Sequence, residues 1–528
     1  MAPNSIHELL KEQLVQFCLH TSLHGWLHTV LPEKRQLERW TWVLICLTSL
    51  STALWLTLTA WFKFQESPTI LVSDSKQYPI YHYPFPAVTI CGYNKISKKR
   101  AYAFAEQTVG QANVSSFANE LRLLTALITN DARGDDDAKL RRALDEHGLS
   151  AESVLERLAP SCGDELNQCA WKKEERKCSD IFERIATPDG FCCSFNYFGP
   201  KNHVFGGTLA NKAPKLPRRV STCGYQTGLE VFIKNDVDDY LAATTPSVGQ
   251  KVVIHHPRQY PDRSFQFVTT SVDKTYLIGI HPDLVVTSEN VRDLPVEQRR
   301  CAFARERDLS NFELYSYHNC AIEYKMNAIL EYCGCLPFYY RNPRGSTANS
   351  KICTLDDVEC LKNREGLLAN SEPWLDSDGN GTSANYECPA DCETAWYTFE
   401  TSSGDLVGTY SFDAHSIYGT GSFKNGTMLR VYFADLTGTR HRRAVIFTWY
   451  TLLAHYGGIL ALFTGFSFVS VIEIVYFFTI RLLMNLKKRE TRGSKAAHRI
   501  RVYPKHLPII KSEAASYDGD IRKRTKSK

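Results

Sequence analysis

The chain has 528 residues, a formal net charge of +5 and 17 cysteines. It contains no HExxH, Walker, GxSxG or dinucleotide-binding motif, so nothing in the sequence proposes an enzyme, a cofactor or a catalytic metal. The excess positive charge is concentrated in a C-terminal tail that has no fold signal of its own, which argues against a nucleic-acid partner.

The first apolar segment, residues 40–62, contains 23 residues without a charge and lies between Arg39 and Lys63. This length suits one transmembrane helix with some tilt. The segment is too long, and begins too far along the chain, for a typical cleaved signal peptide. We therefore expect residues 1–39 to form a short cytoplasmic segment before a first transmembrane helix at 40–62.

Residues 63–443 hold most of the cysteines, 15 of the 17. They also contain three N-glycosylation sequons, at Asn113, Asn380 and Asn425. Such a density of cysteine predicts a disulfide framework in an oxidising compartment, which makes this segment extracellular. A zinc cluster is the competing interpretation of closely spaced cysteines, but it needs a cytosolic segment, and the sequons argue against one.

The extracellular segment mixes strand and helix patterns, so we expect one large α+β ectodomain. Strands are predicted over residues 229–234, 251–255 and 429–433. Helices are predicted over residues 116–129 and 138–158, where apolar residues recur at three-to-four spacing. The acidic run Asp135–Asp137 fits the N-terminus of a helix better than a metal site. The region from Cys301 to Cys392 is expected to consist of short elements joined by disulfides.

The second apolar segment, residues 444–480, contains 37 residues without Lys, Arg or Asp. A helix needs only roughly 20 residues to cross a bilayer. Small residues recur on one helical face of this segment, at Ala454, Gly458, Ala461 and Gly465. Close packing of helices explains this stripe without any pore.

Polar groups in the second apolar segment are not explained by packing. Glu473 is the only carboxylate there, and a charge in a span normally faces a cavity or a partner, although near the cytoplasmic end it can also snorkel to the interface. The other polar groups expected along a pore are His455 and Ser470. The triplet Gly465-Phe466-Ser467 permits a non-helical turn, whose freed carbonyls are tolerated at depth only when buried or facing water. A ring of carbonyls and hydroxyls can replace the hydration shell of an ion, so the triplet predicts a selectivity filter built from several subunits.

The C-terminal tail, residues 481–528, carries 15 Lys or Arg and 4 Asp or Glu, a net charge of +11. Basic residues beside a transmembrane segment favour the cytoplasmic side, so we expect both termini inside the cell. A basic tail at the bilayer surface attracts anionic plasma-membrane lipids. The simpler alternative is a solvated, disordered tail that carries orientation signals.

Four separated motifs point to one family. They are His24-Gly25; Phe85–Cys91 with Asn94; Tyr315-Ser316 with Cys320 and Cys333–Pro337; and Leu452–Ser467 with Glu473 and Tyr476. Together these motifs resemble the gating motif, the motif after the first span, the cysteine-rich signature and the pore helix of the degenerin/epithelial sodium channel family. The resemblance covers about residues 20–482. The Gly-Phe-Ser triplet and the Cys192-Cys193 pair are most similar to insect pickpocket subunits.

The resemblance implies a trimer with a clenched-hand ectodomain like that of acid-sensing channels, and sodium conduction that is amiloride-sensitive and voltage-insensitive. It also assigns roles to six residues: Gly465, Phe466 and Ser467 form the selectivity filter, His24 and Gly25 act in gating, and Ala454 occupies the position where a bulky substitution locks degenerins open.

The resemblance further implies a set of disulfides. The implied pairs are Cys91–Cys192, Cys162–Cys169, Cys301–Cys392, Cys320–Cys388, Cys333–Cys360 and Cys335–Cys353. Three cysteines remain, so one of them stays free or bonds another chain, and we expect Cys193 to pair with Cys223 and Cys178 to be left over. One disulfide of the family is absent at both ends, because Tyr324 and Tyr386 stand where the family has cysteine.

Three other motifs have simple interpretations. Residues 376–387 match the spacing of a calcium loop, but no helices are expected around them and Asn380 is also a sequon, so a solvated turn is expected. Arg440–Arg443 is interpreted as a juxtamembrane basic cluster rather than a protease site. His255-His256 lacks the spacing of metal ligands and is expected at the end of a strand.

The leading hypothesis is a subunit of a sodium channel in the plasma membrane of sensory or epithelial cells, assembled as a homotrimer or with related subunits and gated through its ectodomain. Two alternatives share the two-span topology. One is an ATP-gated cation channel, which has different pore motifs. The other is a class B scavenger-type lipid receptor, whose second span should be a plain apolar anchor. The stimulus stays open among protons, peptides, small molecules and force.

Overall fold

The computed structural model describes residues 3–66, 68–111, 113–131, 135–201, 216–341, 347–364, 388–406, 425–446 and 448–487, with no side chains for residues 3–9 and 135–137. The chain divides into two compact units. The membrane unit joins Met1–Phe64 to Phe447–Lys528, and the ectodomain comprises Gln65–Ile446.

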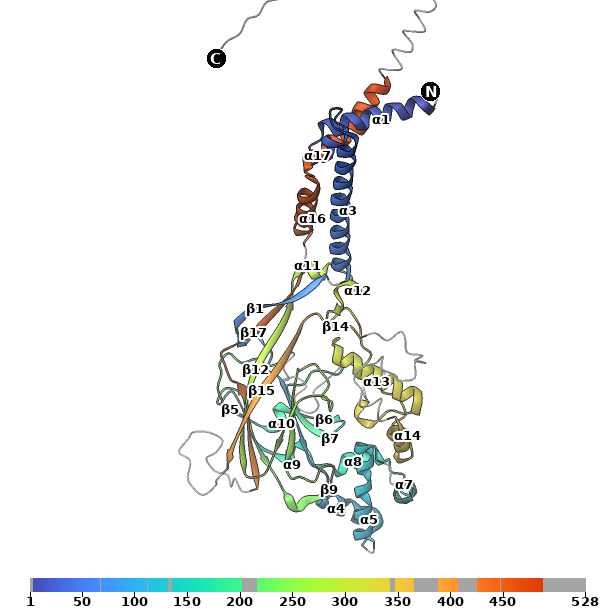
Figure 1. Ribbon diagram of the computed structural model, residues 1–528. Helices are drawn as coiled ribbons and strands as arrows, with labels where there is room; N and C mark the ends of the chain where they lie inside the picture. The colour runs from blue at the N-terminus through green and yellow to red at the C-terminus, as the bar shows by residue number, and fades with distance from the viewer. Residues whose placement is uncertain are drawn as a thin grey trace, which may run out of the picture. The chain divides into compact units, whose positions relative to one another are not determined.

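The membrane unit contains both long apolar segments. Its helices are α1 (Pro3–His20), α2 (Trp26–Val30), α3 (Gln36–Glu66), α16 (Trp449–Thr464) and α17 (Phe468–Val475), followed by a π-helical turn over Tyr476–Ile480. Figure 1 shows α16 and α17 running beside α3, and the Ser49 hydroxyl of α3 donates to the Phe463 carbonyl of α16.

Among the residues that the structure describes, two helices are long and apolar enough to cross a membrane, Gln36–Glu66 and Phe468–Lys487. The first contains the span predicted at residues 40–62. The second predicted segment, 444–480, differs in two ways from one continuous helix. It begins as strand, because Ala444 and Val445 pair with Ile70 and Thr69, and it is interrupted between α16 and α17.

The ectodomain is built on an eight-stranded sheet, with the order β1-β17-β12-β16-β8-β4-β5 and with β15 added to β12. Its strands are β1 (Thr69–Pro79), β4 (Leu166–Trp171), β5 (Glu174–Arg176), β8 (Leu229–Lys234), β12 (Lys274–Thr287), β15 (Thr394–Asp405), β16 (Gly426–Phe433) and β17 (Thr437–Val445). The long strand β12 pairs in parallel with β16 along its first half and with β17 along its second. Pro282 lies between these two registers, where a missing N–H is tolerated.

A second sheet has five strands in the order β11-β10-β2-β7-β6. These strands are β2 (Ala87–Gly92), β6 (Phe182–Thr187), β7 (Gly190–Phe195), β10 (Gln250–His255) and β11 (Phe267–Thr270). Two small pairs join β3 (Asn94–Ser97) to β9 (Tyr240–Ala243), and β13 (Cys301–Ala302) to β14 (Ala390–Asp391).

Helices complete the ectodomain, and Figure 1 shows α4, α5, α7 and α8 gathered at one end of it. The helices are α4 (Lys98–Val109), α5 (Val114–Glu120), α6 (Ala126–Thr129), α7 (Asp135–Glu146), α8 (Ala151–Leu158), α9 (Cys162–Glu165), α10 (Cys178–Ile181), α11 (Glu289–Arg292), α12 (Val296–Arg299), α13 (Tyr317–Cys333) and α14 (Val358–Asn363). Short 3₁₀ turns lie at η1 (Ile80–His82), η2 (Leu121–Thr125), η3 (Val237–Asp239), η4 (Phe338–Tyr340) and η5 (Leu355–Asp357).

Side chains of both large sheets meet in one buried core. Phe85, from the motif after the first span, is fully buried there and packs edge-on against the rings of Trp171, Phe195 and Phe433. Burial of a large aromatic ring stabilises the fold by roughly 1.5–3 kcal/mol. The conspicuous apolar motif is therefore a core element of the ectodomain.

The elements predicted in the ectodomain are helices or strands as expected, but the predicted boundaries of the helices differ from the observed ones. The three predicted strands form β8, β10 and β16, and His255 ends β10 as expected. The two predicted helices are each divided. Residues 116–129 form α5, η2 and α6 in succession, and residues 138–158 form α7 and α8, because Gly148 adopts a left-handed φ of 63° between them.

Candidate ion pathway

The break between α16 and α17 consists of Gly465, Phe466 and Ser467. Gly465 ends α16 in a left-handed conformation with φ 68°, and its N–H donates to the Ala461 carbonyl at 2.9 Å. A Cβ at Gly465 would lie 2.6 Å from the imidazole of His24, so both the backbone conformation and the close approach require glycine.

Two serines cap the start of α17: Ser467, the last residue of the break, and Ser470 in the first turn of the helix. Ser467 is the N-cap, and its Oγ accepts from the Ser470 N–H at 3.3 Å. The Ser470 hydroxyl oxygen accepts in return from the Ser467 N–H at 3.1 Å. This reciprocal capping fixes three non-helical residues between two helices, as the sequence predicted for the triplet.

The carbonyls freed by the break are held by other parts of the membrane unit. The last carbonyls of a helix have no partner within the helix, and in a bilayer an unpaired carbonyl is costly. The Phe463 carbonyl accepts from the Ser49 hydroxyl of α3. The Thr464 carbonyl accepts from the His24 N–H at 3.0 Å. The break is therefore braced by the first transmembrane helix and by the N-terminal segment.

The N-terminal loop, residues 21–25 between α1 and α2, reaches the break through the His24-Gly25 motif. Gly25 adopts φ 82°, and a Cβ there would lie 2.8 Å from the Cys46 sulfur of α3. The His24 ring lies against Gly465, which leaves space for it because glycine has no side chain. Gly25 in the same way leaves space for the Cys46 sulfur. Two motifs that are 440 residues apart in the sequence thus form one site.

Glu473 is bound by the same loop. Its Oε2 accepts from the Ser22 N–H at 2.9 Å, the Ser22 hydroxyl at 3.1 Å and the Thr21 hydroxyl at 3.3 Å. The Ser22 and Ser470 hydroxyls are also 2.8 Å apart, and Ser470 is fully buried. Three hydrogen bonds compensate part of the cost of a carboxylate in this position, and through them Glu473 braces α17 against the N-terminal loop.

Sequence reasoning did not identify Thr21, Ser22, Ser49 and Cys46 as part of the site. Ser49 lies in a long apolar segment, and Thr21-Ser22 are separated from the His24-Gly25 motif only by Leu23. A hydroxyl within a transmembrane helix, or beside a glycine motif, is the signal that could have found them.

Next to the braced region, α1 packs against the π-helical turn through aromatic rings. The Phe17 ring lies 5.7 Å from that of Phe477 and 5.3 Å from that of Phe478. Phe17, Cys18 and Phe477 are buried in a small core. This contact anchors the helix that carries the N-terminal loop.

Gly457 and Gly458 of α16 lie in open space, unlike Gly465 at the end of the same helix. A Cβ at Gly457 or Gly458 would meet no described atom within 4 Å. Ala454 and His455, also on α16, are exposed, as is Ser467 at the break, and Phe466 is half-buried. Within the described part of the membrane unit, packing against α3 therefore does not account for the stripe of small residues.

The structure forms seven disulfides among the described cysteines of the ectodomain. Five are the pairs that the resemblance implies: Cys91–Cys192, Cys301–Cys392, Cys320–Cys388, Cys333–Cys360 and Cys335–Cys353. The expected Cys162–Cys169 pair is wrong, because Cys162 bonds Cys193 and Cys169 bonds Cys178. The expected Cys193–Cys223 pair is wrong for the same reason, and Cys223 is free.

Strand geometry explains the corrected pairs. Adjacent residues of a strand point to opposite faces of the sheet. Cys192 therefore faces Cys91 on the neighbouring strand β2, while Cys193 faces the other side and meets Cys162 at the start of α9. The Cys192-Cys193 pair thus fastens β7 on both faces.

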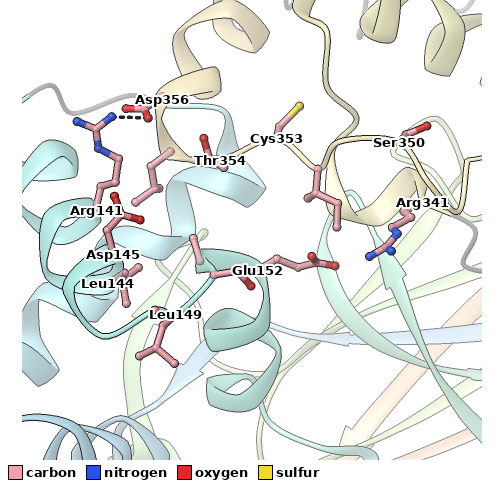
Figure 2. A pocket seen from close by; sticks show the side chains of 15 residues that line it. Arg141, Leu144, Asp145, Leu149, Glu152, Arg341, Ser350, Cys353, Thr354 and Asp356 are labelled. Atoms are coloured by element: carbon pink, nitrogen blue, oxygen red, sulfur yellow. Dashed lines mark hydrogen bonds and ion pairs between the residues drawn. The ribbon is translucent and has the colours of Figure 1, made fainter.

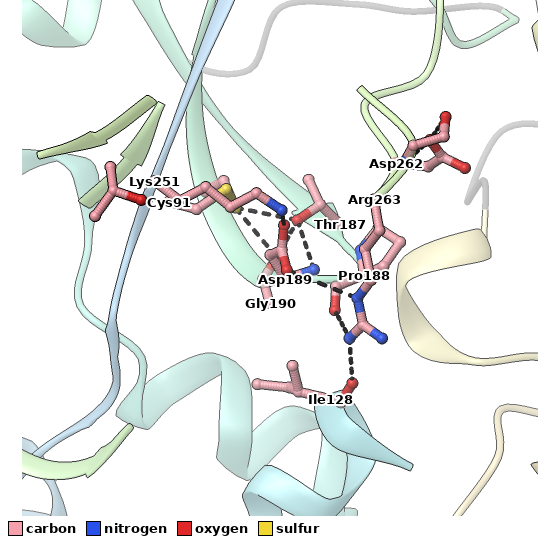
Figure 3. Close-up of polar contacts among 12 residues, drawn as sticks. Cys91, Ile128, Thr187, Pro188, Asp189, Gly190, Lys251, Asp262 and Arg263 are labelled. Atoms are coloured by element: carbon pink, nitrogen blue, oxygen red, sulfur yellow. Dashed lines mark hydrogen bonds and ion pairs between the residues drawn. A yellow bond between two sulfur atoms is a disulfide. The ribbon is translucent and has the colours of Figure 1, made fainter. Parts of the chain in front are cut away.

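A cluster of charged groups, of which Lys95 is buried, lies in the ectodomain around the turn between β6 and β7. Asp189 pairs with Lys251 at 2.6 Å, and Arg263 donates to the carbonyls of Ile128 and Pro188 at 2.8 and 2.7 Å (Figure 3). The Lys95 ammonium donates to the carbonyl of Asp189 at 2.5 Å. This cluster ties the second sheet to the helical end of the ectodomain.

Desolvation shifts the pKa values of two groups at the edge of this cluster, Lys95 and Glu165. Burial lowers the pKa of Lys95 to about 8, and it raises the pKa of the Glu165 carboxyl to about 7. Lys95 attracts the Glu165 carboxylate and partly opposes that rise. Sequence spacing gave no signal of this cluster, because folding brings together residues that are far apart along the chain.

The remaining predicted sites divide between described and undescribed residues. Asn113 and Asn425 are exposed, as a glycan requires. Asn380 and the calcium-like segment 376–387 lie outside the described residues. Among the described residues, no group of three His, Cys, Asp or Glu side chains could hold a metal ion.

A disulfide-rich ectodomain and an interrupted, braced second span together define a two-span membrane protein of the channel class. The chain belongs to the amiloride-sensitive sodium channel family, whose sequence profile matches residues 17–477. This is a family of ion channels and not of enzymes. The family match does not support the lipid-receptor or the ATP-gated alternative.

Relatives of known description agree with this assignment. The sodium channel protein Nach of Drosophila melanogaster is 25% identical over 501 residues, covering 93% of this chain and 91% of its own. Pickpocket protein 11 of the same species is 26% identical over 478 residues, covering 90% and 77%. Acid-sensing ion channel 4 of Rattus norvegicus is 24% identical over 474 residues, covering 88% and 78%. The predicted likeness to insect pickpocket subunits is confirmed.

Proposed function

We propose that the chain is a subunit of a trimeric, voltage-insensitive and amiloride-sensitive sodium channel, gated through its ectodomain. The subunit would act in the plasma membrane of sensory or epithelial cells, alone or with related subunits, with both termini cytoplasmic. The basic tail would lie near anionic lipids. One break in a single helix cannot enclose a pore, so several copies around an axis are required, and the family resemblance sets their number at three.

The observation that carries this proposal is the braced break at Gly465–Ser467. Non-helical backbone inside a membrane is tolerated only where it is buried in protein or lines water. The break is held on one side by Ser49 and His24, and its Ser467 side chain is exposed on another. Three such breaks around an axis would present carbonyls and serine hydroxyls to a sodium ion.

The bracing also supports a gating role for the N-terminal loop. The loop holds the end of α16 through His24 and holds α17 through Ser22, which contacts Glu473 and Ser470. A displacement of the loop therefore changes the hydrogen bonds on both sides of the break. Opening would couple motion of the ectodomain to the break through α3 and α16.

The test is the sodium current of Ala454→Phe in oocytes. Bulk on the small-residue face should hold the pore open and give a constitutive, amiloride-blocked sodium current. Leu453→Phe places the same phenyl ring at the adjacent position, on another face of α16, and serves as the control. The proposal fails if Ala454→Phe reaches the surface, alone and with related subunits, and carries no more current than Leu453→Phe.

A further inference from the structure

A pocket of about 690 Å³ opens in the ectodomain (Figure 2). Helices α7 and α8 form one wall, and the segment of residues 350–356 forms the other. The size is that of sites which hold small organic molecules. The pocket belongs to the ectodomain alone, so it is separate from the ion pathway described above.

The floor of the pocket is apolar and is continuous with the helical core. Leu144, Leu149, Ile352 and Leu355 line it, and Leu144 and Leu355 are themselves buried in that core. An apolar floor favours a ligand with a hydrocarbon or aromatic body, because burying such a body releases water from both surfaces.

The walls of the pocket are held in place by covalent and ionic contacts. Cys353 is bonded to Cys335 at the end of α13, which fixes one wall. An ion pair between Arg141 of α7 and Asp356 joins the two walls at one end of the opening, and Figure 2 shows it as a dashed line. The pocket therefore exists before a ligand arrives, which reduces the entropic cost of binding.

The charged side chains that line the pocket differ in whether they have a hydrogen-bond or ion-pair partner. Arg141 and Asp356 neutralise each other, and Arg341 donates through Nε and NH2 to the Ala348 carbonyl at 3.3 and 3.1 Å. Glu152 and Asp145, in contrast, make no side-chain hydrogen bond or ion pair with any residue that the structure describes. Two carboxylates thus retain their capacity to accept hydrogen bonds from a ligand.

Glu152 is the better placed of these two carboxylates. It is half-buried, and Figure 2 shows its side chain extended into the pocket toward Arg341. Burial raises the pKa of the Glu152 carboxyl, while Arg341 opposes that rise. A partly desolvated carboxylate without a hydrogen-bond donor gains more from a cationic ligand than one that is fully hydrated.

We propose that this pocket binds a small organic cation, with its ammonium or guanidinium group on Glu152 and its apolar body over Leu144, Leu149 and Ile352. Asp145 adds negative potential at the rim, while the Arg141–Asp356 pair limits the length of the ligand. A neutral molecule of the same shape would leave Glu152 unpaired, and an anionic one would be repelled by it.

The test measures binding of 2-phenylethylammonium to the purified full-length chain in detergent by titration calorimetry. The neutral and anionic comparison probes are 2-phenylethanol and 3-phenylpropionate. The proposal predicts saturable binding of the cation, and binding of the other two that is weaker by about tenfold or more. Glu152→Gln keeps the shape of the side chain and should weaken cation binding by a similar factor.

The matched control is Glu146→Gln, which removes a carboxylate from α7 that does not line the pocket and should leave binding unchanged. The proposal is overturned if no probe binds saturably, if the alcohol binds as tightly as the cation, or if Glu152→Gln binds like the wild type. A loss of affinity in Glu146→Gln equal to that in Glu152→Gln also overturns it. None of these outcomes depends on ion conduction, so they are independent of the proposed channel function.

Discussion

Gly465 and Gly25 are the residues whose missing side chains let the N-terminal loop reach the break in the second span. Each has a positive φ, and a Cβ on either would come within 3 Å of an atom of the opposing segment. Other glycines of the same helix have no such constraint, as Gly457 illustrates. This contrast makes the role of a single glycine measurable.

Gly465→Ala should destabilise the membrane unit, because alanine in a left-handed conformation costs about 1–2 kcal/mol and its Cβ also meets His24. Gly457→Ala should be neutral or stabilising by up to about 1 kcal/mol, because alanine is the better helix former. Thermal midpoints of the two purified variants in detergent provide the comparison. Equal shifts in the same direction would remove Gly465 from its assigned role.

Ser22 and Glu473 should be energetically coupled, since the Glu473 carboxylate accepts from both the N–H and the hydroxyl of Ser22. A double-mutant cycle of Ser22→Ala and Glu473→Gln should give a coupling energy of about 1 kcal/mol or more. Thr48→Ala is the control partner, because the Thr48 hydroxyl bonds only within α3. Strictly additive effects of Ser22→Ala and Glu473→Gln would mean that the loop does not hold α17.

At the scale of elements, β7 shows how one strand uses two neighbouring cysteines. Cys192 fastens β7 to β2, and Cys193 fastens it to α9. Cys223 lies outside this arrangement and is free. The strand therefore depends on Cys193, and not on Cys223, for its second attachment.

Cys193→Ser should lower the free energy of unfolding by about 2–5 kcal/mol, the usual effect of losing a native disulfide. Cys223→Ser should leave it nearly unchanged. Non-reducing peptide mapping of the wild type should recover a Cys162–Cys193 peptide and alkylated Cys223. Recovery of a Cys193–Cys223 peptide instead would contradict the pairing described above.

The elements that sequence predicts best are those with a strong local signal. The Gly465-Phe466-Ser467 triplet predicted the non-helical turn between α16 and α17, and alternation predicted β8, β10 and β16. The contacts between Ser22 and Glu473 were beyond such reasoning, because 451 residues separate them. Cysteine spacing likewise could not show that Cys192 and Cys193 face opposite sides of one strand.

The whole ectodomain should respond to acid through a buried histidine. His255 is 1% exposed, and burial lowers its pKa to about 3 from an ordinary 6.5. The folded state binds a proton on His255 less readily than the unfolded state does. The contribution of neutral His255 to stability is therefore complete above pH 6.5 and is lost as the pH falls toward 3.

The free energy of unfolding should therefore fall by up to about 1.4 kcal/mol per pH unit for this group over that interval. His255→Gln should show a shallower fall, measured by denaturant unfolding of the full-length chain in detergent between pH 6.5 and 4. The exposed His147→Gln variant is the control. A slope in His255→Gln as steep as that of the wild type would show that another group governs the acid response.

At the scale of the whole channel, we expect Gly465–Ser467 to form the narrow part of the sodium pathway. The reversal potential of the Ala454→Phe current, in sodium and in potassium, tests this most directly. Ser467→Ala removes the hydroxyl, while Ser467→Asn changes the group but keeps a side chain that caps helices well. Both should alter the sodium-to-potassium permeability ratio, whereas Val469→Ala, on the exposed surface of α17, should not. An unchanged ratio in both Ser467 variants would contradict the account.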